Sequence, residues 1–460
     1  MPLHHGGQVQ VNLTAPPYSP LRLMALALSA TLVPLGSTMI AVALPDIGAE
    51  FAKEPGLLTQ WLVSSYLLVG IIGQSPGGKL GDYWGYEKTL RLGQGVFGFG
   101  SLLAALYPHF AAVAVSRVLM AAGGAFMVPT VMAVARVTVP PEKRHRIFGY
   151  IGAMMGMAAA IGPFLGGFLV HHFGWRSVFL MNFPPLILSI AVSWTYFKDT
   201  IHQKPEHGFV FDYVGTGLMT LWLVLLVGGL KGKFLLLGPA LLGFGAFLWW
   251  ESRVQHPLLN LKLFAHRAFG AGCAMVGLQN LGMYALLFQM PYLLKLLYQW
   301  EPSQAGHTMT FFMISMMVGS ALGGRVAEKL GVLATCMAGS LISVGGFTLL
   351  SILERGEGVA KLIGALILGG AGLGLANGPS QSAALGSIDK KESGIASGVL
   401  ATSRYLGGVF GISILGFLLS RTPTGASLAD HREALWIFAG SFAVTVLVSL
   451  LFPGKPPAKG

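Results

Sequence analysis

A titratable side chain in or beside a long apolar run could carry a proton, and the candidates of this kind that we select are Asp46, Asp82, Asp212 and His307. A carboxyl or imidazole group in such a place can be charged or neutral, and its surroundings shift the balance between the two forms. None of the four lies clearly in the middle of a run, and a lone histidine at the start of a run is more often an interfacial residue. We treat all four as candidate proton carriers.

The sequence has none of the usual signatures of an enzyme or a metal centre. It contains no HExxH or GxSxG motif and no clustered carboxylates, so a membrane-embedded enzyme is not expected. Cys273 and Cys336 both lie inside apolar runs, where they indicate neither a disulfide framework nor a metal site. We expect no cofactor. Residues 1–21 lack a basic stretch followed by a cleavage site, so we interpret them as a cytosolic tail and not as a signal peptide.

Apolar runs follow one another along the whole chain. Only 10% of the residues are charged, whereas an average soluble domain has about 25%. Most runs are long enough to cross a bilayer as a helix, and the 64 glycines would let such helices pack closely. We therefore expect an all-α polytopic membrane protein. Its fourteen transmembrane helices are expected at about 22–44, 59–78, 89–107, 110–135, 146–170, 177–196, 211–230, 234–250, 268–294, 304–326, 331–352, 360–385, 394–420 and 433–453.

A nine-residue motif occurs twice and indicates that the chain is built from two similar halves. Gly77–Gly85 reads GGKLGDYWG and Gly323–Gly331 reads GGRVAEKLG, each between two apolar runs. Two six-helix bundles separated by two extra helices would place both copies in equivalent loops. The expected parts are a tail, a first bundle, two extra helices with linkers, a second bundle and a second tail, at 1–21, 22–197, 198–267, 268–453 and 454–460.

The basic residues of the loops predict the orientation in the membrane. With the N-terminus in the cytosol, Lys and Arg are about twice as frequent in the inner loops as in the outer loops, as the positive-inside rule requires. Both motif copies then lie in inner loops, and both termini are cytosolic. The net charge of +12 is explained by this topology, so no nucleic-acid partner is expected.

Eight motifs occur in order over nearly the whole chain. They are VALPDI at 42–47, Gln60 with Trp61 and Tyr66, GGKLGDYWG at 77–85, SRVLMAAGGAFMVPT at 116–130, GPFLGG at 162–167, GWRSVFLMNFP at 174–184, FDYVG at 211–215 and GIASGVLATSRYLGG at 394–408. Together they resemble the fourteen-helix drug:proton antiporter family of the major facilitator superfamily. The resemblance implies a multidrug exporter of the bacterial inner membrane, which moves hydrophobic or amphiphilic small molecules by alternating access and is driven by a proton gradient.

The resemblance also implies roles for particular residues. The two motif copies would latch the halves together on the inner side, and their glycines would pack against the other half. The latch residues would be Gly78, Asp82, Gly85, Gly324, Arg325 and Glu328. Arg117 and Arg404 would gate the path or tune a proton site, because an arginine inside an apolar run must face protein or water. Alternatively, the side chains of Arg117 and Arg404 could extend toward the membrane surface and place their charged ends there, without a functional role. A face of small residues in the 146–170 helix would seal the path between the halves. This face would consist of Gly156, Gly162, Pro163, Gly166 and Gly167.

The first helix departs from the family pattern. Gly36 stands where the family carries an acid, which favours as an alternative an uncoupled facilitator or a translocator of lipid-like substrates. A membrane receptor or scaffold that does not transport is a third possibility. Hydrogen-bonding and aromatic side chains are expected to line the substrate cavity, or else to hold helices together: Ser37, Thr38, Gln60, Trp61, Tyr66, Gln279, Asn280, Asn377 and Gln381. We expect a monomer in the lipid bilayer, and a periplasmic adaptor remains open as a partner.

Overall fold

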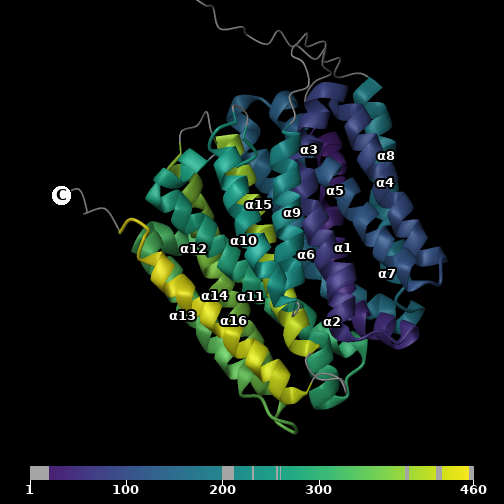
Figure 1. The fold of residues 1–460 in the computed structure, drawn as a ribbon, viewed down its shortest axis with the longest axis vertical. Helices are drawn as coiled ribbons and strands as arrows, with labels where there is room; N and C mark the ends of the chain where they lie inside the picture. The colour runs from purple at the N-terminus through teal and green to yellow at the C-terminus, as the bar shows by residue number, and fades with distance from the viewer. Residues whose placement is uncertain are drawn as a thin grey trace, which may run out of the picture.

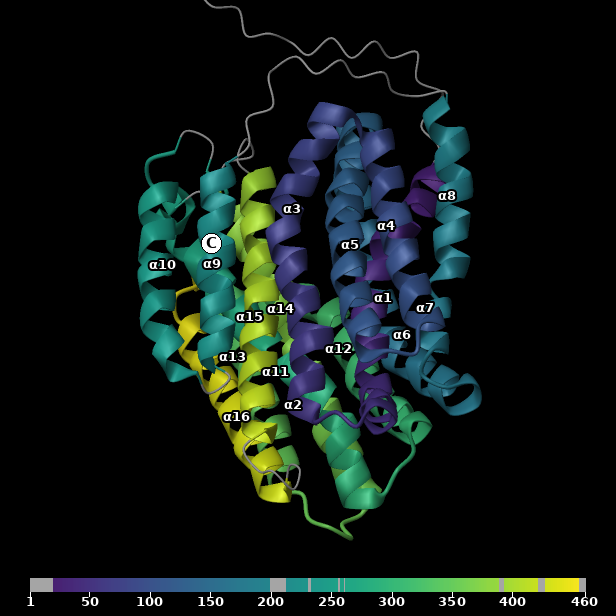
Figure 2. The same ribbon diagram turned by 45° about the vertical axis from the view of Figure 1, so that its right-hand side comes forward.

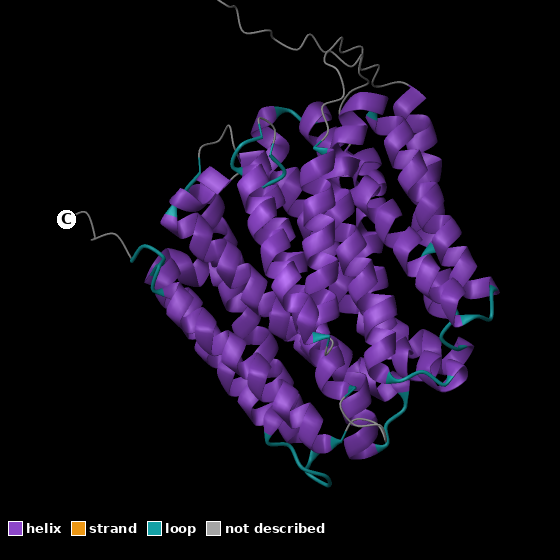
Figure 3. Cartoon of the chain, in the orientation of Figure 1, coloured by secondary structure: helices purple, strands orange, loops and turns teal. Residues whose placement is uncertain are grey.

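The computed structural model describes residues 20–198, 212–230, 233–254, 257–259, 261–388, 393–420 and 427–454. Nearly all of these residues are helical, as Figure 3 shows. This confirms the prediction of an all-helical chain. The two predicted tails lie outside the described residues, apart from the few positions that border the first and last helices.

The helices follow the predicted apolar runs closely. In the first half they are α1 (Pro20–Phe51), α2 (Pro55–Leu58), η1 (Thr59–Ser64), α3 (Ser65–Trp84), α4 (Tyr86–Leu106), α5 (Phe110–Thr138), α6 (Pro141–Phe173), α7 (Ser177–Leu180) and α8 (Phe183–Lys198). The middle of the chain forms α9 (Tyr213–Leu230), η2 (Phe234–Leu236), α10 (Leu237–Glu251) and η3 (Leu261–Ala265). The second half forms α11 (Arg267–Tyr298), α12 (Pro302–Leu330), α13 (Val332–Ser351), α14 (Val359–Gly386), α15 (Ser393–Leu419) and α16 (Leu428–Ser449).

Twelve stretches of the described chain, not the expected fourteen, are long and apolar enough to cross a membrane by length and composition. The two expected segments outside this set correspond to α4 and α10. Helix α10 has only 15 residues, about 22 Å at the usual rise, which is shorter than a hydrocarbon core of about 30 Å. Helix α4 carries Glu87, Lys88 and Arg91 in its first two turns, which lowers its mean hydropathy.

The helices form two groups and a separate pair. Helices α1 to α8 pack mainly on one another, as do α11 to α16, and in Figure 1 the first group is purple to blue and the second green to yellow. Helices α9 and α10 pack on each other and reach the groups through α15 and α3. Figure 2 shows this pair at the edge of the molecule, next to α15. The pair therefore lies against the place where the two groups meet.

The repeated motif makes the same turn in both groups. Gly85 joins α3 to α4 with φ of +93°, and Gly331 joins α12 to α13 with φ of +88°, a backbone conformation that a residue with a Cβ rarely adopts. An added Cβ at Gly77 would overlap the Ala125 carbonyl of α5, and one at Gly323 would overlap the Leu375 carbonyl of α14. These glycines thus pack within their own group. The expectation that they pack against the other half is wrong.

We call the end of the molecule with the Gly85 and Gly331 turns the motif end, and the opposite end the far end. Close contacts between the two groups occur at the far end. At one of them, an added Cβ at Gly56 of α2 would lie 2.8 Å from the Gly416 carbonyl and from Ser420 Cβ of α15. The second contact joins α6 to α12. These two backbone contacts hold the far end closed in this conformation.

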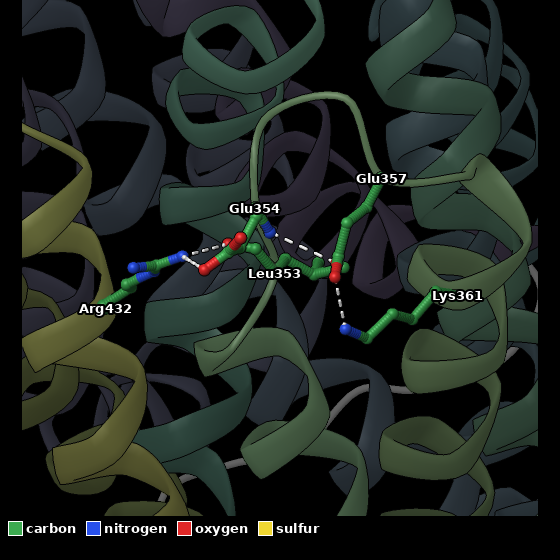
Figure 4. Close-up of polar contacts among 5 residues, drawn as sticks. All are labelled: Leu353, Glu354, Glu357, Lys361 and Arg432. Carbon is green, nitrogen blue, oxygen red and sulfur yellow. Dashed lines mark hydrogen bonds and ion pairs between the residues drawn. The ribbon is translucent and has the colours of Figure 1, made fainter.

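Ion pairs fix the loops at the far end. In Figure 4, Arg432 Nη2 of α16 donates to the Leu353 carbonyl at 2.7 Å and lies 3.6 Å from Glu354 Oε1. Lys361 Nζ lies 2.7 Å from Glu357 Oε1 in the same loop. The neighbouring ammonium group of Lys361 lowers the pKa of the Glu357 carboxyl below its usual value. The loop between α13 and α14 is therefore tied to α16 and to its own following helix.

Candidate functional site

A buried arginine lies at the centre of the first group. Arg117 of α5 is only 1% exposed. Its Nε donates to the Leu62 carbonyl at 2.8 Å and its Nη1 donates to the Gly36 carbonyl at 3.2 Å. Its guanidinium carbon lies 4.0 Å from the centre of the Tyr66 ring, in cation–π geometry. Arg117 thus faces protein and does not reach toward the membrane surface, and its gating or proton-tuning role stays a prediction.

Local helix geometry sets up these contacts. Leu62 belongs to η1, a π-helical turn between α2 and α3, and such turns are rare and frequent at functional sites. The Tyr66 hydroxyl donates to the Val33 carbonyl of α1 at 3.0 Å and thereby fixes the ring under the guanidinium group. Arg117 Nη2 has no hydrogen-bond partner among the described residues. The cation is therefore held in place with one nitrogen free to bind.

In the second group, four of the predicted residues form one polar chain. Asn377 donates to Gln279 Oε1 at 3.5 Å, and Gln381 donates to Asn377 Oδ1. Arg404 Nη2 of α15 then donates to Gln381 Oε1 at 2.8 Å. The chain runs from α11 through α14 to α15. Arg404 is therefore bound inside the protein and does not reach a lipid headgroup here.

Three tyrosines lie between the two arginines. Tyr66 is within electrostatic range of Arg117, Tyr284 and Tyr405, and the last two are within range of Arg404. A small pocket joins the groups at this place, lined by Val33, Tyr66, Gly70, Gln74, Ala121, Gly124, Ala125, Val128 and Tyr405. The centre of the molecule thus contains two cations, three phenol rings and several amides.

Sequence reasoning missed Tyr284, Tyr405 and Gln74. Tyr284 of α11 lies beside Ser37 of α1, and Gln74 of α3 lies beside Tyr405 of α15, so each pair connects the two groups. Tyr405 directly follows Arg404 in a motif that had been recognised, which was the available signal. Tyr284 and Gln74 carry no comparable signal in the sequence.

The other predicted cavity residues are mostly satisfied within their own helices. Ser37 and Thr38 both donate to the Pro34 carbonyl of the preceding turn at 3.0 Å. Asn280 donates to the Val276 carbonyl at 2.8 Å. Trp61 is 50% exposed, on the outside of η1. Gln60 is half-buried in the same turn. These residues contribute no free polar group to the centre in this conformation.

One face of the glycine-rich segment of α6 packs against α1. An added Cβ at Gly162 would overlap Thr38 Oγ1, and one at Gly166 would lie 2.9 Å from the Met39 carbonyl. No side chain larger than hydrogen fits at these two positions without moving α1. This part of the motif therefore serves packing within the first group.

The other face of the same segment packs against the second group. An added Cβ at Gly306 of α12 would overlap the Pro163 carbonyl and lie 3.0 Å from Gly167 Cα. Gly156, one to two turns earlier, faces open space. Pro163 and Gly167 thus form the α6 side of the far-end contact, and Gly156 takes no part in it.

The predicted latch residues lie apart at the motif end. Arg325 and Glu328 are exposed near the end of α12, and an added Cβ at Gly324 would meet nothing within 4 Å. Gly78 is in ordinary contact with Pro129 of the same group. The Asp82 side chain lies outside the described part of α3. The described atoms form no acid–base contact between the groups at this end.

The candidate proton carriers differ in their surroundings. Asp46 lies near the far end of α1, within range of Lys295 and Glu301. His307 is exposed at the far end, with its ring 5.1 Å from that of Phe164 of α6. Neither is next to the central arginines. Asp212 is in a different position, at the motif end of the α9–α10 pair.

Asp212 faces a second buried acid. Asp212 and Glu251 are 7% and 3% exposed. Asp212 Oδ1 accepts hydrogen bonds from Gly215 N at 2.7 Å and Trp250 Nε1 at 2.9 Å, and Glu251 Oε2 accepts one from Leu259 N at 2.8 Å. The second oxygens, Asp212 Oδ2 and Glu251 Oε1, have no described partner, and a methyl group at Gly215 would collide with both.

Lys79 of the first motif copy lies within electrostatic range of Glu251. Two carboxyl groups thus face each other at one buried place, with a lysine of the motif nearby. Of these two acids, the sequence analysis named only Asp212 as a candidate proton carrier. No group of three or more His, Cys, Asp or Glu side chains in the described chain could hold a metal ion.

The chain resembles known membrane transporters in sequence. The Major Facilitator Superfamily model matches residues 26–412 and again 268–460. An uncharacterized MFS-type transporter, YvkA of Bacillus subtilis, is 31% identical over 86% of this chain and 90% of its own length. The tetracenomycin C resistance and export protein of Streptomyces glaucescens is 28% identical over 86% of this chain and 75% of its own length.

A solved structure has the same fold. The crystal structure of a bacterial homolog of the human lysosomal transporter Spinster, in an inward-facing and unoccupied conformation, aligns with a TM-score of 0.69 and 14% identity. The alignment covers 96% of this chain and all of that one. The two chains therefore share one fold.

Proposed function

This chain belongs to the major facilitator superfamily, and on that premise we propose that it exports hydrophobic or amphiphilic small molecules by alternating access, coupled to proton antiport. Several of its relatives are named as multidrug or antibiotic exporters, which supports this substrate class. Its relatives and structural neighbours are transporters, and it is not an enzyme.

The far-end closure is the observation that carries the proposal. Two helix groups meet there through glycines, Gly306 on Pro163 and Gly56 on α15, so small rotations of the groups can break or make the contact. In our mechanism the far end is the outer gate. When the groups rock so that the inner side closes, the motif copies, including Asp82 and Glu328, latch the inner gate. Arg117 and Arg404 contact the substrate at the centre.

The proposed arrangement in the membrane has fourteen crossings. Helix α4 has 21 residues, and η2 extends α10 at its start, so both can cross a bilayer despite their composition and length. The first and second bundles, 22–197 and 268–453, would be the rocking units, with 198–267 beside them. The protein would act as a monomer in the bacterial inner membrane, with both termini in the cytosol and the motif end inside.

We place proton coupling at Asp212 and Glu251. The pair is buried, its two free oxygens share one space, and Lys79 connects it to the motif loop that turns at Gly85. Protonation would neutralise one acid and weaken the attraction to Lys79, which links the proton to the position of α3. Among the described residues, neither Asp46 nor His307 has a second buried acid beside it.

The test uses purified protein in liposomes that contain a lipophilic dye as the transported molecule. A pH gradient is imposed across the liposome membrane, and dye movement and lumenal pH are followed together. Dye flux that follows the gradient, with protons moving the opposite way, is the expected result. The Asp212→Asn variant should transport dye without moving protons, whereas Glu357→Gln, a matched change in an exposed far-end loop, should leave coupling intact. Full coupling in Asp212→Asn would remove Asp212 from the carrier role.

An uncoupled facilitator is the second candidate, and Gly36 favours it. Where the resembled family carries an acid, this chain offers Arg117 only the Gly36 carbonyl. Dye movement that ignores the pH gradient in the unaltered protein would establish this alternative and exclude antiport. Saturable dye binding without any flux would instead indicate a receptor.

A further inference from the structure

The central region carries positive charge that no acid balances. Arg117 lies about two turns into α5 and Arg404 about three turns into α15, and neither forms an ion pair with a described Asp or Glu. Arg117 is compensated only by two backbone carbonyls and the Tyr66 ring. A buried charge without a counter-ion is costly, and removing its partner is among the largest single effects known for ion pairs.

Both arginines keep hydrogen-bonding capacity close to the same three tyrosines. Arg117 Nη2 has no described partner. Arg404 uses Nη2 for Gln381, and its guanidinium group has five N–H donors in all. Because one arginine comes from each helix group, an anion bound between them would contact both groups at once. That is the position a transported substrate must occupy.

The surroundings of the two cations suit a flat aromatic body. Tyr66 and Tyr405 line the pocket, and Tyr284 lies close to both of them. The other lining residues include small ones such as Gly70 and Gly124. Aromatic rings stack on tyrosine faces in offset or edge-on arrangements, each worth about 0.5–1.5 kcal/mol beyond the buried area. Small residues leave room for a ring to enter when the groups rock.

From this arrangement we propose that the substrate is an aromatic organic anion, whose negative group binds between Arg117 and Arg404 while its rings lie among Tyr66, Tyr284 and Tyr405. The inference rests on the proposed transport function and names its substrate class. A cationic aromatic drug would meet two like charges at the centre and is disfavoured by the same geometry.

A matched pair of dyes tests the charge preference. Fluorescein is an anion at neutral pH and a rhodamine ester is a cation, but both have the same planar xanthene rings. Binding to the full-length protein in nanodiscs is measured by fluorescence anisotropy, with empty nanodiscs as background. We expect fluorescein to bind at least about tenfold more tightly. Equal binding, tighter rhodamine binding, or no fluorescein binding would overturn the proposal.

Three variants sharpen the test. Arg404→Gln should weaken fluorescein binding about thirtyfold or more, the size of the effect for a lost buried charge pair, whereas Arg404→Lys should retain part of it. Arg432→Gln removes an equal charge at the far end and should leave fluorescein binding unchanged. Equal losses in Arg404→Gln and Arg432→Gln would refute the central site.

Gly36→Asp should reverse the preference. An added Cβ at Gly36 is in ordinary contact with Met120 at 3.6 Å and Asn182 at 3.7 Å, so a side chain can begin there without displacing backbone. Its carboxylate would neutralise Arg117, weaken fluorescein binding and strengthen rhodamine binding. An unchanged preference in this folded variant would count against the proposal. Binding without flux would refute the transport function and leave the substrate class standing.

Discussion

Replacing Gly306 with alanine should shift the protein out of the conformation described here. The new methyl group would overlap the Pro163 carbonyl and lie 3.0 Å from Gly167 Cα, so it meets backbone on α6 that no rotamer change can move. Inserting a methyl group into a closely packed site costs about 1–3 kcal/mol. Because α6 and α12 can separate by rocking, this cost falls on the far-end-closed state. A cost of that size changes the ratio of two states about 5- to 150-fold.

Distances between spin labels at the far ends of α6 and α12 report this ratio. Cysteines introduced at exposed Phe173 and Gln304 can be labelled selectively, because Cys273 and Cys336 are buried. Double electron–electron resonance on the labelled protein in nanodiscs should show the short-distance population decreasing in Gly306→Ala and a longer one increasing.

The control is Gly152→Ala on α6, where an added Cβ meets nothing within 4 Å. It should leave the distance distribution unchanged. A folded Gly306→Ala protein with the distances of the unaltered protein would show that α6 and α12 do not limit the closed state. An equal shift of the distances in Gly152→Ala would show that the change in Gly306→Ala does not arise from the contact between Gly306 and Pro163.

Three further outcomes are expected. Gly407→Ala would push a methyl group into the Gly277 carbonyl and should lower the thermal unfolding temperature in detergent, whereas Gly398→Ala in open space on the same helix should raise it slightly or leave it unchanged. Tyr66→Leu removes both the ring beneath Arg117 and a hydrogen bond, so it should destabilise the protein more than Tyr66→Phe, by about 2 kcal/mol; equal losses would show that the ring contributes nothing. Glu357 has a lowered pKa, so its contribution to stability is present above about pH 4.5 and is lost as the pH falls through the lower folded-state pKa. Thermal scans should therefore separate Glu357→Gln from the unaltered protein at neutral pH and not in strong acid.

Much of the fold was predictable because bilayer-spanning helices are set by local properties. A run of apolar residues and a turn glycine such as Gly85 specify a helix and its end without reference to the rest of the chain. Helices α4 and α10 were the exceptions in the count of spans: α4 begins with charged residues, and the 15 residues of α10 form a helix but do not by themselves meet the length of a bilayer crossing.

The site was predictable only in part, because its contacts join distant segments. Gln279, Asn377, Gln381 and Arg404 were each identified by polarity inside an apolar run, and the structure connects them in one chain. The pairing of acids across α9 and α10 depends on how two helices are rotated about their axes. A sequence without aligned relatives contains no measure of that rotation.

The unbalanced charge at Arg117 and Arg404 has an electrical consequence. If a singly charged anion leaves the cell in exchange for one entering proton, each cycle moves two positive charge equivalents inward. An inside-negative potential of 100 mV would then supply about 4.6 kcal/mol per cycle, since each elementary charge contributes about 2.3 kcal/mol. Export would continue in a voltage-clamped liposome with no pH gradient. The membrane potential would be a power source for this protein in its own right.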